Sequence, residues 1–88
     1  MKPLVYILQS RKNSRYYIGS TDNIERRLKQ HNNGLAVSTK NIRPLELKAI
    51  LQCNTIEEAR INEHKLKDYK SRKIIEKVVE SGIFPWDY

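Results

Sequence analysis

The sequence lacks a cysteine pair, a long apolar run and enough acidic residues to balance its basic ones. The single cysteine, Cys53, excludes an internal disulfide and fits the reducing cytoplasm, where we expect the protein to reside. His31 and His64 lack the close spacing of zinc ligands. No stretch approaches the roughly 20 apolar residues of a membrane-spanning helix. Residues 1–3 lead directly into a strand pattern, so we expect no signal peptide.

Positive charge is what the chain has in excess. It contains 17 Lys and Arg against 10 Asp and Glu, a formal net charge of +7 within 88 residues. This length suits one small domain, and such a charge favours a polyanionic partner. Because the basic residues do not form an amphipathic helix with bulky apolar anchors, we expect nucleic acid and not a membrane. The alternative is a solvated basic surface without a specific partner.

The apolar pattern predicts an α+β fold in one domain, residues 1–82, followed by an aromatic tail, residues 83–88. Both faces of the first strand are apolar, so we expect it at the centre of the sheet. The expected elements are strands at residues 4–8, 16–20 and 45–51, a hairpin turn at 10–15, a loop at 35–44, and helices from Asp22 to about Asn33, from Thr55 onward, and from about Ser71 to Gly82.

Local signals mark two helix starts and one close approach. Asp22 with Glu25 predicts a capping box for the first helix, and Thr55 with Glu58 predicts one for the second. Gly19 lies inside the second strand, where a glycine often marks close approach of another group to the backbone. The aromatic tail would either dock on the domain or extend into solvent.

Two phenols, a guanidinium and an imidazole are candidate chemical groups. Tyr6 and Tyr17 fall in neighbouring strands, where they would handle a proton or pack as ordinary cross-strand aromatics. Arg27 and His31 share one edge of the first helix. Arg27 would bind a phosphate or remain a solvent-exposed arginine. His31 would act as a base or hydrogen-bond donor, or would interact with the helix dipole.

Glu63 interrupts the apolar stripe of the second helix, between Ala59 and Leu66. An ionised carboxylate on an inward face is costly unless something pairs with it. A single hard oxygen ligand suits Mg²⁺ or Mn²⁺, with water and substrate phosphate completing the shell. The alternative is a boundary glutamate in an ordinary salt bridge. Further basic residues would hold a nucleic-acid backbone or form a solvated face: Lys65, Lys67, Lys70, Arg72, Lys73 and Lys77.

The order of these features resembles the GIY-YIG nuclease superfamily, and within it the small bacterial proteins that consist of this domain alone. Val5 departs from the glycine-isoleucine of the first motif and leaves the tyrosine in place. The resemblance covers roughly residues 3–75 and rests on Val5-Tyr6-Ile7, Tyr17-Ile18-Gly19, the run from Asn23 to Asn32, Ser38-Thr39-Lys40, Arg43-Pro44, Glu58-Ala59, Glu63 and Lys67.

The resemblance implies a three-stranded antiparallel sheet flanked by helices, and metal-dependent hydrolysis of DNA phosphodiesters. It implies that Glu63 binds one Mg²⁺ or Mn²⁺ ion and that Tyr6 and Tyr17 lie near the attacking water. It further implies that Arg27 contacts the scissile phosphate and that His31 assists proton transfer. Ser20 stands where some repair nucleases of the superfamily have a lysine. The residues expected to bind the nucleic acid are Arg26, Lys40, Arg43 and Lys67.

From these expectations we predict that the protein is an endonuclease that cuts DNA in a structure-directed way, in repair or recombination. A protein partner would supply specificity. One alternative is a nucleic-acid-binding module that keeps the nuclease fold with little or no cleavage. A second alternative is an adaptor that binds another protein through its aromatic tail.

Overall fold

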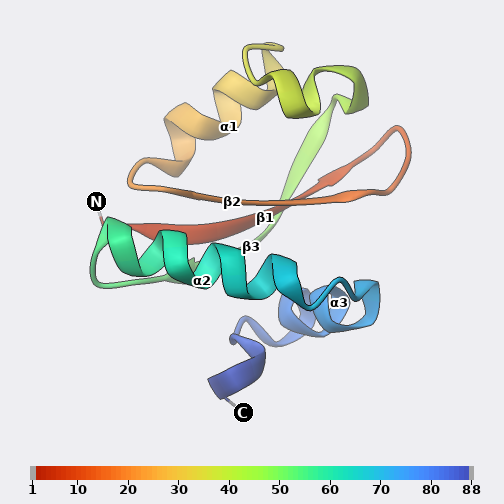
Figure 1. Cartoon of the computed structure of the whole chain (residues 1–88). Coiled ribbons are helices and arrows are strands. Elements are labelled where there is room, and N and C mark those ends of the chain that lie inside the picture. Colours follow the sequence, from red (N-terminus) through yellow and green to blue (C-terminus); the bar gives the residue numbers. More distant parts are fainter. Residues whose placement is uncertain (1, 88) are drawn as a thin grey trace.

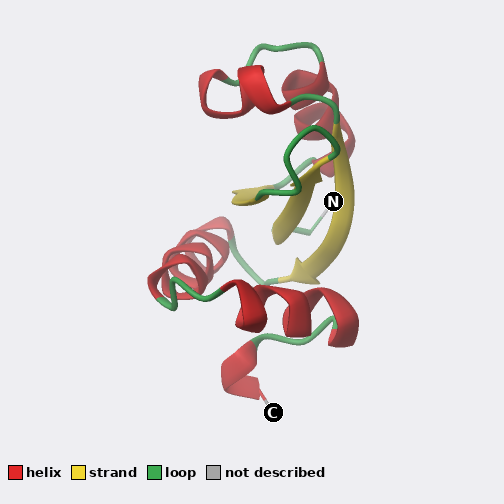
Figure 2. Ribbon diagram, turned by 90° about the vertical axis from the view of Figure 1, so that its right-hand side faces the viewer, coloured by secondary structure: helices red, strands yellow, loops and turns green. Residues whose placement is uncertain are grey.

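The computed structural model of the protein describes residues 2–87. A three-stranded antiparallel sheet lies between two layers of helices (Figures 1 and 2). Met1 and Tyr88, the outer residues of the expected domain and tail, lie outside the described residues. The elements are β1 (Leu4–Ser10), β2 (Tyr16–Thr21), α1 (Ile24–Asn32), the 3₁₀ helix η1 (Val37–Ile42), β3 (Leu45–Gln52), α2 (Ile56–Asp68), α3 (Arg72–Ser81) and the 3₁₀ helix η2 (Pro85–Asp87).

The strand order is β2-β1-β3, so the central position predicted for the first strand is confirmed. Figure 2 shows α1 and η1 on one side of the sheet and α2 and α3 on the other. Side chains of a strand alternate between the two faces, and β1 is apolar at both sets of positions. The three-stranded α+β fold expected from the sequence is therefore the observed one.

The two faces of β1 belong to two separate cores. Val5 and Ile7 pack in the larger core with residues of α2 and α3, among them Leu66 and Val78. Leu4, Tyr6 and Leu8 form the smaller core beneath α1 and η1. A phenol therefore occupies a buried position in the small core, where its hydroxyl needs a polar partner.

The start of α1 corrects one expectation. Its N-cap is Asn23, whose side chain accepts a hydrogen bond from the Arg26 amide at 3.1 Å. Asp22 lies one residue earlier, in an exposed ion pair with the Arg26 guanidinium at 3.4 Å. The prediction of an Asp22–Glu25 capping box is therefore wrong. The chain is still turning out of β2 at Asp22, because the Thr21 hydroxyl accepts a bond from the Asn23 amide at 3.1 Å.

The other predicted helix ends are confirmed. Thr55 caps α2 by accepting the Glu58 amide at 3.0 Å, and the Glu58 carboxylate accepts the Asn54 amide at 3.2 Å. Ser71 caps α3. Gly82 ends α3 with φ +72°, a left-handed conformation that glycine adopts without steric cost.

The segment expected as a loop, residues 35–44, contains the short helix η1. Arg43 closes the segment by donating from Nε to the Lys40 carbonyl at 2.9 Å. Its guanidinium lies against Gly34, which has φ +78°. The turn that follows α1 is fixed in this way, and η1 places Thr39 wholly inside the protein.

The tail docks on the domain over the described residues 83–87. Phe84 is buried in the larger core, and Trp86 stacks on it with ring centroids 4.7 Å apart. The ring of Tyr69, the C-cap of α2, has its centroid 6.3 Å from that of Trp86. The Lys65 ammonium of α2 lies 4.1 Å from the Trp86 ring centroid. Among residues 2–87, no helix has the length and apolar character needed to cross a membrane.

Candidate active site

Gly19 allows the phenol of Tyr6 to lie across the neighbouring strand. The two residues are partners in the β1–β2 register, and Tyr6 is 1% exposed. A Cβ placed on Gly19 would lie 2.3 Å from Tyr6 Oη and 2.4 Å from its ring carbon Cζ. The close approach expected at Gly19 is therefore confirmed, and the approaching group is a candidate chemical group itself.

The Tyr6 hydroxyl joins a chain of buried polar groups. Arg27 donates from Nε to Tyr6 Oη at 3.3 Å, and His31 Nε2 lies 2.9 Å from the same oxygen. The other imidazole nitrogen, Nδ1, lies 2.7 Å from the Thr39 hydroxyl. That hydroxyl donates to the Ala36 carbonyl at 3.5 Å. His31 and Thr39 are both wholly buried, so these contacts replace water.

The donors and acceptors of this chain fit one arrangement of protons. Because Arg27 only donates to the Tyr6 oxygen, the Tyr6 proton goes to His31 Nε2, and the neutral ring carries its hydrogen on Nδ1, which donates to the Thr39 oxygen. Nε2 then carries a lone pair and accepts the Tyr6 proton. Arg27 has only donors, so it occupies a lone pair of the phenol oxygen. His31 is therefore assigned as a neutral imidazole that accepts from Tyr6.

The pKa shifts agree with this assignment. Burial, helped by the Arg27 charge, lowers the pKa of His31 to about 4, so the imidazole is neutral near pH 7. Burial raises the pKa of Tyr6, although the hydrogen bond and charge of Arg27 act against it. The negative charge of Glu63 also raises the pKa of Tyr6. The bond to Tyr6 raises the pKa of Arg27, which stays charged.

Tyr17 is the phenol on the open side of the group. Its ring centroid lies 6.3 Å from that of Tyr6 and 5.0 Å from that of His31, and the side chain is half-buried. The Lys67 ammonium lies 5.9 Å from the Tyr17 ring centroid on the side of α2. Tyr17 therefore stands between the buried polar chain and the charged groups of α2.

Glu63 is held by two partners. Its Oε1 accepts the Ser20 hydroxyl at 2.5 Å, and its Oε2 accepts the Lys67 ammonium at 2.5 Å. The side chain is 15% exposed, so the carboxylate is mostly inward-facing, as its place on the apolar stripe predicts. The ion pair supplies the compensation that a buried carboxylate requires. Lys67 also brings a cation close to Ser20, where some relatives are expected to carry a lysine.

The donor chemistry of Glu63 fits a water-rich metal ion. Within residues 2–87, no three His, Cys, Asp or Glu side chains converge as a ready-made metal cage. Mg²⁺ is commonly bound through one or two carboxylates while water and substrate phosphate complete its shell. Glu63 is such a carboxylate, with the Ser20 hydroxyl and the Lys67 ammonium on its two oxygens, so it would hold an ion together with substrate oxygens once the ion replaces Lys67.

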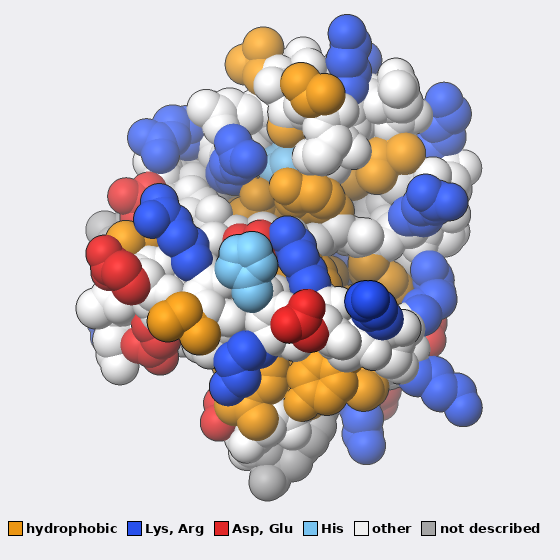
Figure 3. Space-filling model, in the orientation of Figure 1, with side chains coloured by type: hydrophobic (Ala, Val, Ile, Leu, Met, Phe, Trp, Pro, Cys, Tyr) orange, Lys and Arg blue, Asp and Glu red, His pale blue; other side chains and the backbone are white. Residues whose placement is uncertain are grey.

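The expected nucleic-acid contacts divide into two groups. Arg26 lines a polar groove of about 360 Å³ together with Arg27, and Lys67 lies beside Glu63. Lys40 and Arg43 belong to the η1 segment, and Arg43 is engaged by backbone carbonyls. Figure 3 shows Lys and Arg side chains around an apolar surface between the two helical layers.

The sequence pattern did not indicate two residues that lie at the site. Thr39 carried no signal beyond its place in a motif, because its segment was expected as a loop. Arg60 lines the same polar groove as Arg27. It lies three residues before Glu63 on α2, so the helical spacing of i and i+3 would have found it.

The structure thus brings Tyr6, Tyr17, Arg27 and His31 together, with Glu63 beside them. His31 is enclosed behind Tyr6, so it has no surface to offer an attacking water directly. In comparisons with known proteins, the family model described as the GIY-YIG catalytic domain matches residues 2–79. No curated protein and no solved structure matches the chain.

Proposed function

Because the chain belongs to the GIY-YIG nuclease family, we propose that it is an endonuclease that hydrolyses DNA phosphodiester bonds with one bound Mg²⁺ or Mn²⁺ ion. The observation that carries this proposal is the polar chain from Arg27 through Tyr6 to His31, which lies beside Tyr17 and close enough to Glu63 for that carboxylate to raise the pKa of Tyr6. Branched, nicked or gapped DNA of the kind met in repair and recombination is the proposed substrate, with a protein partner adding specificity.

Arg27 would bind the phosphate. Its Nε is taken by Tyr6 and its Nη1 by Gln30 at 3.0 Å, which fixes the plane of the guanidinium. The group lines the polar groove, so its remaining donors face a phosphate placed there. A fixed, charged donor stabilises the charge that develops on phosphate oxygens in the transition state. A divalent ion at Glu63 would supply further charge neutralisation on the same phosphate.

Tyr17 would contact the attacking water, because it is the half-exposed phenol of the pair. As a phenolate it would take the water's proton and leave hydroxide as the nucleophile, and the positive charges of Arg27 and Lys67 lie close enough to offset the phenolate's charge before the transfer. Tyr6 is enclosed, so its task is to hold Arg27 and to share its own proton with His31. His31 is then a positioning residue that acts through Tyr6.

The test is cleavage of nicked, branched, gapped and linear duplex DNA in Mg²⁺ or Mn²⁺ by the full chain and by Glu63→Gln. We expect Glu63→Gln to lose at least about 100-fold in rate, the scale of removing one electrostatic contributor. Glu57→Gln, an exposed glutamate of the same helix, is the matched control and should cut normally. Cleavage that survives Glu63→Gln would refute the mechanism.

A second candidate function is a nucleic-acid-binding module without cleavage. The ion pair between Lys67 and Glu63 favours it, because the carboxylate already has a cationic partner. Binding of DNA with no cleavage in either metal would establish this alternative. Paramagnetic broadening of Ser20 signals by Mn²⁺ separates the two further. If Lys67 excludes the ion, broadening appears only in Lys67→Gln.

A further inference from the structure

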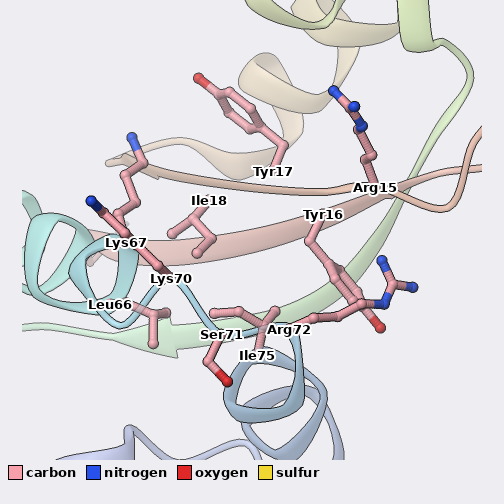
Figure 4. Close-up of a pocket in the computed structure, with 10 residues that line it drawn as sticks. All are labelled: Arg15, Tyr16, Tyr17, Ile18, Leu66, Lys67, Lys70, Ser71, Arg72 and Ile75. Carbon is pink, nitrogen blue, oxygen red and sulfur yellow. The ribbon is translucent and has the colours of Figure 1, made fainter.

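A second groove, with a cavity of about 370 Å³, lies on the other side of Tyr17 from the polar groove. It runs along the free edge of β2, facing the junction of α2 and α3 (Figure 4). Ile18, Leu66 and Ile75 form its apolar floor, and the Tyr16 ring points from β2 toward α3 beside them. Tyr17 lines the upper edge of the groove, and its ring points to the opposite face of the sheet, toward α1. Its size falls in the range of pockets that hold small organic groups.

The rim of this groove is cationic. Arg15 comes from the hairpin, Lys67 from the last turn of α2, Lys70 from the connection between α2 and α3, and Arg72 from the start of α3. No Asp or Glu lines it among the described residues. The Arg72 guanidinium lies 4.8 Å from the Tyr16 ring centroid, so a cation already stacks on one wall. An occupant must therefore combine a flat apolar part with negative charge.

The two grooves flank Glu63 and differ in kind. Ser20 lines the polar groove and Lys67 lines the apolar one, and Glu63 accepts a hydrogen bond from both. The polar groove offers Arg26, Arg27 and Arg60 and suits the sugar-phosphate backbone. The apolar groove adds the Tyr16 ring with the Arg72 guanidinium beside it, and Tyr17 at its upper edge. Bases of single strands stack on aromatic rings and guanidinium planes without sequence preference. A strand that crosses Glu63 therefore meets different surfaces on the two sides of the reacting phosphate.

We propose that the apolar groove binds one unpaired base of a DNA strand, next to the phosphate at Glu63. This inference rests on the proposed nuclease function and specifies its substrate as DNA with an unpaired nucleotide on one side of the cut. A base inside a duplex is stacked and paired, so its faces are not available to Tyr16 or Tyr17. The unpaired base stacks there while its flanking phosphates lie on the rim lysines and arginines.

The experiment measures binding without metal, so it does not depend on cleavage. Two DNA molecules of equal length are compared, one with a single unpaired 5-iododeoxyuridine beside a nick and one with that base paired. Fluorescence anisotropy in EDTA gives the affinities, and ultraviolet crosslinking with mass spectrometry locates the iodinated base. We expect the unpaired form to bind at least about 10-fold more tightly, the lower part of the range for one base stacked on an aromatic side chain. Its crosslink should map to Tyr16 or Tyr17.

Variants separate stacking from charge. Tyr16→Leu keeps apolar volume and should remove most of the preference for the unpaired form, provided that circular dichroism shows a folded protein. Arg15→Gln with Lys70→Gln should weaken binding of the unpaired form more than the matched pair Lys29→Gln with Lys48→Gln, which removes the same charge outside the groove. Tyr69→Leu, outside the groove, controls for loss of an aromatic ring and should keep the preference.

Equal affinity for the two DNA forms, or a crosslink that maps outside the groove, would overturn this inference. Cleavage that needs Glu63 but ignores the unpaired base would leave the nuclease proposal standing and overturn the groove proposal alone. Preferential binding with no cleavage in any metal would overturn the nuclease proposal and retain the base-binding groove.

Discussion

Replacement of Gly19 by alanine should displace the Tyr6 phenol. The added methyl group would lie 2.3 Å from Tyr6 Oη and 2.4 Å from Cζ, distances at which one of the groups must move. Gly19 is not among the glycines with positive φ, so its backbone suits alanine. The effect of Gly19→Ala is therefore steric, and it acts on the phenol that holds Arg27 and His31.

The cost has two parts. Forcing an extra carbon into a well-packed site costs about 1–3 kcal/mol. A displaced Tyr6 also loses its bond from charged Arg27, a kind of contact that contributes about 1.5–3 kcal/mol. We expect a total loss of about 3 kcal/mol in the free energy of unfolding. In a domain of this size, that corresponds to a fall in Tm of about 15 °C.

Thermal and urea unfolding measure this loss, and a double-mutant cycle with Tyr6→Leu assigns its cause. Leucine has no atoms in the place of Oη and Cζ, so Gly19→Ala should cost less than about 1 kcal/mol in that background. The coupling energy should then be about 2 kcal/mol. Gly82→Ala is the control, because Gly82 has φ +72° and a Cβ added there would meet no atom within 4 Å. It should destabilise the protein equally with or without Tyr6→Leu.

A Gly19→Ala protein with unchanged Tm would refute the conclusion that Gly19 makes room for the Tyr6 phenol. So would an equal loss in both backgrounds, since the cost would then come from the strand and not from the phenol. DNA cleavage by Gly19→Ala at 20 °C below its Tm gives a further check. The folded variant should cut at least about 100-fold more slowly, because Arg27 loses its fixed position.

Three further predictions concern the buried polar chain and the tail. Thr39→Val should lower the free energy of unfolding by about 1–3 kcal/mol, measured in urea, because it leaves the His31 Nδ1 hydrogen without an acceptor. Thr39→Ser keeps the hydroxyl, so the ¹⁵N shifts of His31 should remain those of a neutral ring protonated on Nδ1. The pKa of His31 is about 4 in the folded state against 6.5 when unfolded, so the unfolded chain binds more protons and stability falls as pH decreases between these values. The loss between pH 7 and pH 5 should be about 2 kcal/mol and should vanish in His31→Gln; a pH-independent difference between the two proteins would contradict it. Phe84→Ala should cost about 3 kcal/mol in thermal unfolding because Phe84 lies in the larger core, while exposed Ile83→Ala should cost less than about 1 kcal/mol, and similar small losses in both would show that the tail does not stabilise the domain.

Short-range patterns in the sequence determined the elements of the fold. The alternation in residues 4–8 placed an apolar strand at the centre of the sheet, because strand side chains alternate with a period of two. Thr55, Ser71 and Gly82 marked helix ends through bonds to residues three or four positions away. The ordered tyrosines, arginine, histidine and glutamate were also sufficient to indicate the GIY-YIG family, which the family model over residues 2–79 confirms.

The tertiary structure decided how those side chains are used. Neighbouring positions alone did not separate Asp22 from Asn23 as the N-cap, since both residue types cap well and the turn out of β2 made the choice. The docking of Phe84 depends on the shape of a core built from residues far away in sequence.

Contacts across long sequence separations decided the chemistry of the site. His31 is closed off by Tyr6 and by Thr39 from a segment without a helical or strand pattern. Glu63 meets Ser20 only because α2 packs against β2. The sequence by itself identified a carboxylate, two phenols, a guanidinium and an imidazole. Which of them is buried, which faces water and which shares a proton follows from packing between distant elements, because burial and hydrogen-bond partners are properties of the folded chain.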